Sequence, residues 1–319
     1  MTGMSMREAY GRALADYGEQ HPTVVTLDAD TASSTFSNFF ARRFPDRFFN
    51  IGIAEPCLVD VAVGLALGGL VPFANVFASL LSLRALEQIR TCVCYAQTNI
   101  KLVGHYAGVS DYKDGPTHHS ITDIATLRAL PQMVVIVPAD SLEAAAWVPL
   151  IAEHAGPVYL RISRAETIAV HTQAPVLQIG KGIQLRSGND VTLVSCGAMV
   201  GRSLLAADAL LKAGIEARMI EMHTLKPLDA EILVTAAEET GALVTAEEHS
   251  IIGGLGSAVA EVLSGNYPVP LERVGIGDTF ARTGPDPETL MDALGLGVND
   301  IVLAAQRAVA RKLKSRRIV

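Results

Sequence analysis

Short, continuously apolar runs alternate with segments of helical periodicity along the chain, and this alternation constrains the fold more than any other feature. In the first half the apolar runs lie at residues 24–27, 71–77, 100–105, 133–137 and 157–162. The helical segments lie at residues 6–17, 55–69, 80–96, 121–130 and 141–153. Strands that are apolar on both faces and separated by helices are typical of a parallel sheet with helices on both sides. The first half is therefore predicted to be a three-layer α/β domain.

The pattern weakens between residues 165 and 190, where prolines and glycines occur without a sustained period. A second α/β series follows this segment. Its apolar runs lie at residues 191–196, 217–221 and 242–246, and its helical segments at 199–213, 229–240, 253–263 and 299–314. We therefore expect two three-layer α/β domains with mainly parallel sheets, at residues 1–165 and 191–319, with a linker at 166–190.

Composition excludes several classes of protein. Half of the 319 residues are hydrophobic and 18% are charged, which excludes intrinsic disorder. The net charge of −7 gives nucleic-acid binding no support. No apolar run reaches the roughly 18–20 residues of a membrane span, and the first residues lack the features of a signal peptide. We expect a soluble, cytoplasmic protein that binds neither nucleic acid nor a membrane.

The four cysteines lack the paired spacing of a disulfide framework or a zinc site, so we expect free thiols in a reducing compartment. The apolar fraction is nevertheless high for a self-sufficient soluble monomer. This surplus is expected either to fill a large interior or to form surface that contacts another chain. Gly64 and Gly68, four residues apart in a predicted helix, suggest the close approach of a neighbouring helix.

Ligands of open parallel sheets bind beyond the carboxyl ends of the strands, so polar residues there are the first candidates for a functional site. Such residues lie at 28–34, 50–55, 105–119 and 161–164. The third group contains His105, His118 and His119 together with Asp111 and Asp114, which can bind hydroxyls or transfer protons near neutral pH. We predict no metal site, because the adjacent histidines share no helical face and no compact ligand set is present. The alternative for each histidine is a solvated or structural loop residue.

Glu55 lies in an apolar stretch, Ile51-Gly-Ile-Ala-Glu55-Pro56, that opens a predicted apolar helix. Loss of solvent there disfavours the charged carboxylate and favours the neutral acid or a strong hydrogen bond to a basic ring nitrogen. The alternative is an ordinary carboxylate at a helix start, stabilised by the helix dipole.

Two motifs together, Asn50-Ile-Gly-Ile-Ala-Glu55 and Asp114-Gly-Pro-Thr-His118, resemble the transketolase family of thiamine diphosphate enzymes. The resemblance extends over nearly the whole chain but implies only the family's last two domains, the pyrimidine-binding and C-terminal domains. The family's first domain holds the cofactor diphosphate and Mg²⁺ through a Gly-Asp-Gly motif, and the nearest string here, residues 275–278, does not match it. The chain thus resembles the smaller subunit of a split transketolase, whose larger subunit is a separate chain.

The resemblance implies a place for four residues at thiamine diphosphate, which would be shared with a larger subunit that holds Mg²⁺. Glu55 matches the glutamate that bonds the aminopyrimidine ring, and Asp30 matches an aspartate near that ring. Phe77 matches the aromatic patch against which the ring packs. Leu80 stands where many relatives carry a second phenylalanine, which implies weaker or displaced ring stacking.

The resemblance also implies a reaction, in which a two-carbon ketol unit passes from a ketose to an aldose. His105, Asp114 and His118 match residues that bond substrate hydroxyls or assist proton transfer, so His105 and His118 join Glu55 as catalytic candidates. The substrates would be sugars or sugar phosphates.

Three residues match the positions that hold the far, often phosphorylated, end of the sugar in this family. They are Arg7, Ser34 and Arg164. Guanidinium groups suit this role because they form paired hydrogen bonds with anionic oxygens. Residues 109–113 depart from the family's pattern, which implies a different floor of the substrate channel.

Three functions are compatible with these motifs. The first is a catalytic half-enzyme in ketol transfer, and the second is the β subunit of a 2-oxo acid dehydrogenase, which has a similar length and glutamate. The third is a non-catalytic partner module on the same fold. Residues 114–118 and 84–90 favour transketolase. Because the cofactor lies between chains in this family, we expect a homodimeric core that accepts two larger subunits, an α2β2 assembly.

Overall fold

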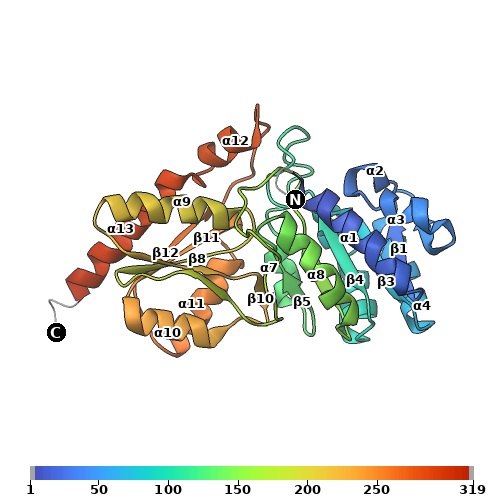
Figure 1. The fold of residues 1–319 in the computed structure, drawn as a ribbon, viewed down its shortest axis with the longest axis horizontal. Coiled ribbons are helices and arrows are strands. Elements are labelled where there is room, and N and C mark those ends of the chain that lie inside the picture. Colours follow the sequence, from blue (N-terminus) through green and yellow to red (C-terminus); the bar gives the residue numbers. More distant parts are fainter. Residues whose placement is uncertain (1–3, 316–319) are drawn as a thin grey trace.

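A seven-stranded sheet forms the centre of the first half of the chain in the computed structural model, which describes residues 4–315 (Figure 1). Its strands lie in the order β10-β5-β6-β4-β3-β1-β2, and all neighbours are parallel except β10 and β5. The strand bounds are β1 Val24–Asp28, β2 Phe48–Asn50, β3 Val71–Phe77, β4 Lys101–His105, β5 Val134–Ile136, β6 Val158–Arg161 and β10 Thr224–Lys226. Each apolar run predicted in this half is a strand of this sheet and is almost entirely buried.

Helices cover both faces of this sheet. The helix bounds are α1 Met6–Gln20, α2 Ala32–Thr35, α3 Asn38–Arg43, α4 Glu55–Leu67, α5 Ala78–Arg84, α6 Leu86–Gln88, α7 Asp123–Ala129 and α8 Ser141–Glu153, with a short turn η1 Pro45–Arg47 and a π-helical segment η2 Ile89–Tyr95. Helices α1, α3 and α8 pack on one face through side chains such as Phe40 and Trp147. Helices α4, α5 and α7 pack on the other face through side chains such as Leu58 and Leu81.

A five-stranded sheet, in the order β12-β11-β8-β9-β7, forms the centre of the second half. The strand bounds are β7 Ile183–Arg186, β8 Val191–Ser195, β9 Ala217–Glu221, β11 Leu243–Ser250 and β12 Leu271–Ile276. The helix bounds are α9 Met199–Lys212, α10 Ala230–Thr240, α11 Leu255–Gly265, α12 Pro287–Ala293 and α13 Val298–Ser315. Helices α9 and α13 cover one face and α10 and α11 the other (Figure 1). The predicted architecture of two three-layer α/β units with mainly parallel sheets is therefore confirmed.

Four strands were not predicted, and all of them lie at sheet edges: β2, β7, β10 and β12. An edge strand has a partner on one side only and is often less buried, so it lacks a continuous apolar run. Strand β7 lies inside the expected linker 166–190 and pairs antiparallel with β9. Strand β10 follows β9 in the chain but joins the first sheet, where it pairs with β5. The single helix predicted at 80–96 is divided into α5, α6 and η2, with a break at Ala85.

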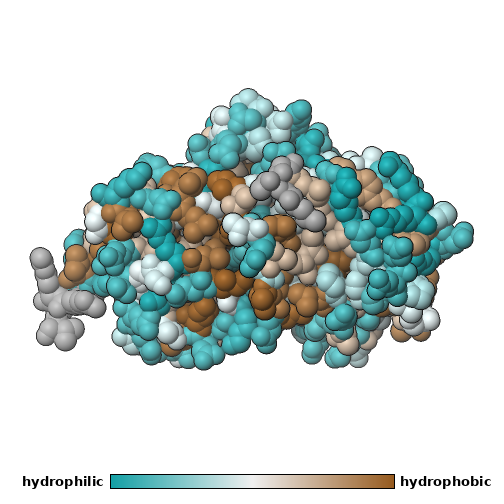
Figure 2. Space-filling view, viewed as in Figure 1, coloured by the Kyte–Doolittle hydropathy of each residue, from teal (hydrophilic) through white to brown (hydrophobic). Residues whose placement is uncertain are grey.

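The two halves share a continuous apolar core. One cluster of buried side chains runs from Leu127 on α7 to Leu233 on α10 and Leu255 on α11. Figure 2 shows that apolar surface also gathers across the middle of one face, where the two halves meet. Burial of this shared core favours one fixed arrangement of the halves over two independent domains.

Residues 287–314 are long and apolar enough, by length and composition, to cross a membrane, in contrast to the expectation from the sequence. Only 33% of the most apolar window is buried. These residues form two helices, α12 and α13, with a break between Ala293 and Val298. Helix α13 packs on α9 and β12, so cover of the second sheet accounts for its apolar face.

A buried ion pair on the first sheet also connects this sheet to the second half of the chain. Arg161, at the end of β6, donates from Nε to Oδ2 of Asp123 at 2.8 Å, and Tyr159 donates to the same oxygen at 2.6 Å. The Nη2 group of Arg161 donates to the carbonyl oxygens of Ser120 at 2.9 Å and of Glu248 at 3.0 Å. Burial opposes ionisation of Asp123, but Arg161 lowers its pKa below the ordinary value, so the carboxylate stays charged.

Replacement Asp123→Asn should destabilise the chain strongly, because it leaves the buried Arg161 guanidinium without its anionic partner. We expect a loss of about 3–5 kcal/mol in the free energy of unfolding, measured by guanidinium titration. The control is Glu8→Gln, which breaks the exposed pair with Arg12 and should cost less than about 1 kcal/mol. Equal losses in the two variants would contradict a structural role for the Arg161 contacts.

Candidate functional site

The carboxyl ends of β1, β3, β4 and β6 meet at one edge of the first sheet, because these strands are parallel neighbours. The loops that leave this edge carry most of the residues singled out in the sequence. Ligands of open α/β sheets bind at such an edge. The side chains here form three groups: a basic group, an aromatic group and a carboxylate at the start of α4.

The basic group is built from Arg7 on α1 and Arg164 after β6, which both contact Tyr106. The guanidinium carbons of Arg7 and Arg164 lie 5.0 Å and 4.9 Å from the centroid of the Tyr106 ring. Arg7 also donates to the carbonyl oxygen of Ser34 at 2.5 Å, so the structure brings Arg7, Ser34 and Arg164 together, whereas their binding of a sugar stays a prediction. Burial is the main cause that lowers the pKa of Arg7, and the charge of Arg164 acts in the same direction. An anion bound between the two guanidinium groups would relieve this repulsion.

Part of the charge of Arg164 is already neutralised by Asp111, with which Arg164 forms an ion pair. Asp111 is fully buried, and burial together with Asp114 raises its pKa against the opposing charge of Arg164. Asp114 itself is exposed at the tip of the loop. The departure from the family pattern at residues 109–113 thus places an acidic group beside a basic residue of the site.

The aromatic group consists of Phe77, Tyr106 and His118. The Phe77 ring lies 4.3 Å from the Tyr106 ring and 5.9 Å from the His118 ring, measured between centroids. His118 is held from both sides, because Ser79 donates to its carbonyl oxygen at 3.1 Å and its Nδ1 lies 3.0 Å from the Thr117 hydroxyl. Phe77 and His118 are only partly buried, so this group offers an apolar surface beside a titratable ring.

His105 is placed differently from the other predicted residues. Its side chain is fully buried, with Nε2 at 3.2 Å from Oδ1 of Asn75 and its ring against Tyr10. Burial, with the charge of Arg7 as a second cause, lowers the pKa of His105 well below its ordinary value. The ring of His105 is fully enclosed in this chain, and its predicted contact with substrate stays a prediction. Tyr106, the next residue, contacts Arg7 and Arg164 instead.

Glu55 is the first residue of α4, and its side chain is 3% exposed. Within residues 4–315 its carboxylate accepts hydrogen bonds only from Nη1 of Arg84, at 3.3 Å and 3.4 Å, and not from the amides of its own helix. This geometry disfavours a helix-capping role. Leu80 lies four residues before Arg84 on α5, so both residues share a face of that helix. The structure therefore places Leu80 on the side of α5 that approaches Glu55.

Asp30 lies exposed just after β1 and is held by Asn50 at the end of β2. The Asn50 side chain accepts from the amide of Asp30 at 3.0 Å and donates to its carboxylate at 3.1 Å. Asp30 has a left-handed backbone (φ 64°), which an aspartate tolerates better than most residues. The pair rests at the same sheet edge as the aromatic group, with a carboxylate oxygen open to solvent.

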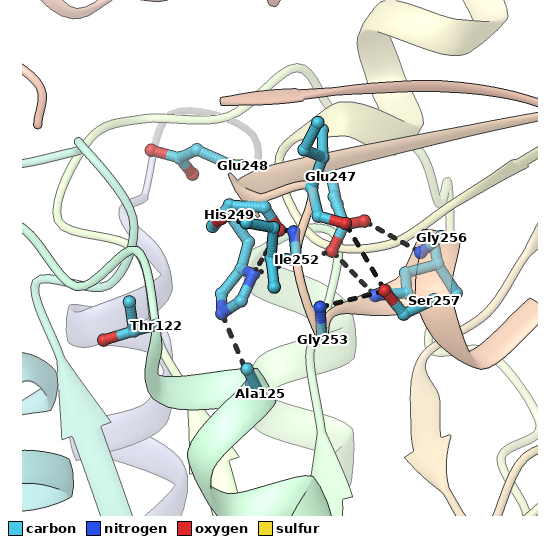
Figure 3. Close-up of polar contacts among 12 residues, drawn as sticks. Thr122, Ala125, Glu247, Glu248, His249, Ile252, Gly253, Gly256 and Ser257 are labelled. Carbon is cyan, nitrogen blue, oxygen red and sulfur yellow. Dashed lines mark hydrogen bonds and ion pairs between the residues drawn. The ribbon is translucent and has the colours of Figure 1, made fainter. Parts of the chain in front are cut away.

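The segment Glu247-Glu248-His249 on β11 ties the second half to this edge (Figure 3). Glu247 accepts from the amides of Leu255 at 2.7 Å and Gly256 at 2.8 Å at the start of α11. His249 accepts at Nε2 from the amide of Ala125 on α7 at 3.3 Å (Figure 3). The motif is therefore a structural joint between the two halves.

Glu248 points away from α11 and reaches the loop of residues 106–120 (Figure 3). Its Oε1 accepts from the amide of Val109 at 2.7 Å. Gly108 must be glycine here, because its φ is +65° and a Cβ would lie 2.3 Å from the Glu248 carboxyl carbon. The second half thus fixes the loop that carries Asp111, Asp114 and His118.

The sequence matches two known families. The family described as Transketolase, pyrimidine binding domain matches residues 2–168, and the family described as Transketolase, C-terminal domain matches residues 180–301. The chain belongs to the transketolase family. The resemblance seen in the sequence is thereby confirmed, whereas the predicted domain limits at 165 and 191 stay predictions.

Two similar proteins are subunits of transketolases. The 6-deoxy-6-sulfo-D-fructose transketolase subunit SqwH of Clostridium sp. (strain MSTE9) is 39% identical over 307 residues, which are 96% of this chain and 95% of that protein. A subunit of the apulose-4-phosphate transketolase of Phocaeicola vulgatus is 36% identical, and the match covers 89% of this chain and 95% of that protein. By contrast, the chain spans 52% of transketolase-like protein 1 of Bos taurus, to which it is 37% identical.

Solved structures likewise match this chain either over their full length or over about half of it. A split gene transketolase, described as an inactive beta4 tetramer, is 46% identical with a TM-score of 0.91, and the match covers 97% of this chain and 100% of that chain. Transketolase from Leishmania mexicana has a TM-score of 0.78 at 21% identity, and the match covers 98% of this chain and 47% of that chain. This second likeness shows the fold alone.

Glu248 should make the stability of the chain depend on pH. Burial raises its pKa to about 7 from an ordinary value of 4.5, so the folded state holds a proton that the unfolded state releases at lower pH. Stability contributed by this group is therefore lost as pH rises from about 5 to 7, by up to about 1.4 kcal/mol per pH unit.

The variant Glu248→Gln keeps an acceptor for the Val109 amide but cannot ionise. Urea unfolding across this pH range should show the variant gaining stability relative to the wild type as pH rises. The exposed Glu238→Gln serves as the matched control and should follow the wild type. If the free energies of unfolding of wild type and Glu248→Gln changed in parallel with pH, the claim that Glu248 is uncharged at the joint between the halves would be refuted.

Proposed function

We propose that this chain is the smaller subunit of a split transketolase, which transfers a two-carbon ketol unit between sugars together with a larger, separate subunit. The observation that carries the proposal is the Glu55 carboxylate, buried at the start of α4 and held only by Arg84 among residues 4–315. The chain that carries this carboxylate matches the pyrimidine-binding and C-terminal domains of the transketolase family. It also matches nearly the full length of two transketolase subunits.

The residues at this edge suit the aminopyrimidine ring of thiamine diphosphate. A carboxyl group with little solvent favours a strong hydrogen bond to a basic ring nitrogen, which Glu55 can supply once the exposed Arg84 moves aside. Phe77 and Leu80 are partly buried and offer apolar surface to a ring. When bound, the cofactor supplies the carbon nucleophile of ketol transfer. Its diphosphate and Mg²⁺ would be held by the larger subunit.

The basic group favours a substrate with an anionic end. Arg7 and Arg164 flank Tyr106 with their charges close together, and only Arg164 is paired with an acid within residues 4–315. Two relatives are named for sugars that carry a sulfo or a phosphate group. We therefore propose an acidic sugar whose anionic group lies between these arginines, with Asp114 and His118 toward its hydroxyls.

Helix α4 has surface that suits another chain. Gly64 has no atom within 4 Å of the position of a Cβ, so no element within residues 4–315 packs against it. Leu67 at the end of α4 is 76% exposed, and Ile53 just before its start is 74% exposed. Since the similar split gene transketolase is described as a beta4 tetramer, we propose that this face forms the homodimeric core of an α2β2 enzyme.

Replacement Glu55→Gln should abolish ketol transfer in the reconstituted enzyme, because the amide cannot exchange a proton with the pyrimidine ring. We expect turnover to fall by at least about 100-fold, with assembly unchanged in size-exclusion chromatography. The assay supplies a panel of phosphorylated, sulfonated and neutral ketoses with an aldose acceptor. The exposed Glu19→Gln is the matched control and should keep full activity.

A second arm supplies a 2-oxo acid with an electron acceptor. Turnover of the oxo acid alone would contradict ketol transfer and favour a dehydrogenase subunit. Full activity of Glu55→Gln with sugars would leave the transketolase assignment intact but remove Glu55 from its role.

A further inference from the structure

Three titratable side chains outside the candidate site meet where the two halves and the segment between them join. Glu143 lies in the first turn of α8, Glu221 ends β9 of the second sheet, and His171 lies in the connecting segment. One candidate ligand atom from each residue lies within 4.8 Å of the other two. The Nε2 atom of His171 is 3.1 Å from Oε2 of Glu221.

The cluster is enclosed, and within residues 4–315 the only side chain in it that can carry a positive charge is His171 itself. Both glutamates are fully buried, and within residues 4–315 the only ion pair that either forms is that of Glu221 with His171. Two carboxylates in contact, away from water, repel each other unless a proton or a cation lies between them. Burial raises the pKa of Glu221 to about 7, and the side chain of Glu143 opposes this shift.

The atoms that face the centre of the cluster are those whose hydrogen bonding is incomplete. Neither carboxylate oxygen of Glu221 has a hydrogen-bond partner of acceptable geometry within residues 4–315, and the same holds for Nε2 of His171. Buried polar atoms are rarely left in this state, and a bound ion is one common explanation. Glu143 differs, because its oxygens accept from Trp147 Nε1 at 3.0 Å and from the Ala139 amide at 2.5 Å.

We propose that Glu143, His171 and Glu221 bind a divalent transition-metal ion of the zinc type. One imidazole nitrogen and two carboxylate oxygens are ligands that Zn²⁺ takes, whereas Mg²⁺ and Ca²⁺ prefer oxygen alone. The ion replaces the repulsion between the two carboxylates with three favourable bonds. A water molecule would complete a tetrahedral shell.

The surroundings of the cluster support such a site. Asp140, the N-cap of α8, accepts from the backbone amides of Val170 at 2.9 Å and His171 at 2.8 Å, which fixes the path of the connecting segment. The Nε1 group of Trp147 donates to Oε1 of Glu143 and so orients its carboxylate. Hydrogen bonds of this kind around the ligands hold them in place before the metal binds. The ion would fasten the connecting segment and the second sheet to α8.

No pattern in the sequence indicates this site, since its three residues are far apart in the chain and belong to separate elements. The proposal does not depend on the proposed function. The proposed role of the ion is structural. Binding of the metal can therefore be measured without any assay of ketol transfer.

The test uses the full chain without a polyhistidine tag, treated with a chelator and then titrated with Zn²⁺ by calorimetry. We expect one ion per chain in the wild type. His171→Ala and Glu221→Gln each remove a direct ligand and should weaken binding by more than about 100-fold, beyond the loss typical of an indirect contact. Glu153→Gln, an exposed residue of the same helix α8, is the matched control and should bind like the wild type.

Thermal unfolding gives a second readout. Zn²⁺ should raise the melting temperature of the wild type and of Glu153→Gln but not that of His171→Ala. His171 is only partly buried in the connecting segment, so its replacement keeps the test open if Glu221→Gln fails to fold. Equal binding by wild type and His171→Ala would place the ion elsewhere and overturn the proposal. Absence of binding to the wild type would overturn it too and would leave a proton shared between the carboxylates.

Discussion

The buried guanidinium of Arg161 is the contact on which the arrangement of the site depends. It binds Asp123 in the first half and the carbonyl oxygens of Ser120 and Glu248, so one side chain holds α7, the end of the site loop and the second sheet together. A buried charge of this kind is stable only when every partner is in place. The position of the loop is therefore coupled to the docking of the two halves.

This coupling explains why the second half matters for a site built at an edge of the first sheet. Glu248 accepts from the amide of Val109 and so fixes the start of the loop, while Arg161 fixes its end. At the same edge, the guanidinium groups of Arg7 and Arg164 both contact the ring of Tyr106. The candidate site thus has a rigid base, as a site that orients a sugar requires. Glu55 on α4 lies outside this network and is bonded to Arg84 on α5.

The central strands and the large helices could be predicted because their apolar patterns follow directly from burial. The edge strands β2, β7, β10 and β12 could not, since a strand of only three to six residues with polar side chains has no distinct period. Within the site, the apolar surroundings of Glu55 were visible in the sequence, and the structure confirms its burial. The burial of His105 was not visible, because only the strand geometry shows that its ring turns inward to Asn75. The role of Glu248 and the grouping of Glu143 with Glu221 arise from tertiary contacts that no local pattern carries.

The central claim is that this chain is part of an enzyme whose cofactor site is completed by another chain. The most direct measurement compares ketol transfer and thiamine diphosphate binding by the purified chain alone and after addition of the larger subunit. We expect no turnover and only weak calorimetric binding for the chain alone, with both restored in the mixture. Robust ketol transfer by this chain alone would refute the claim.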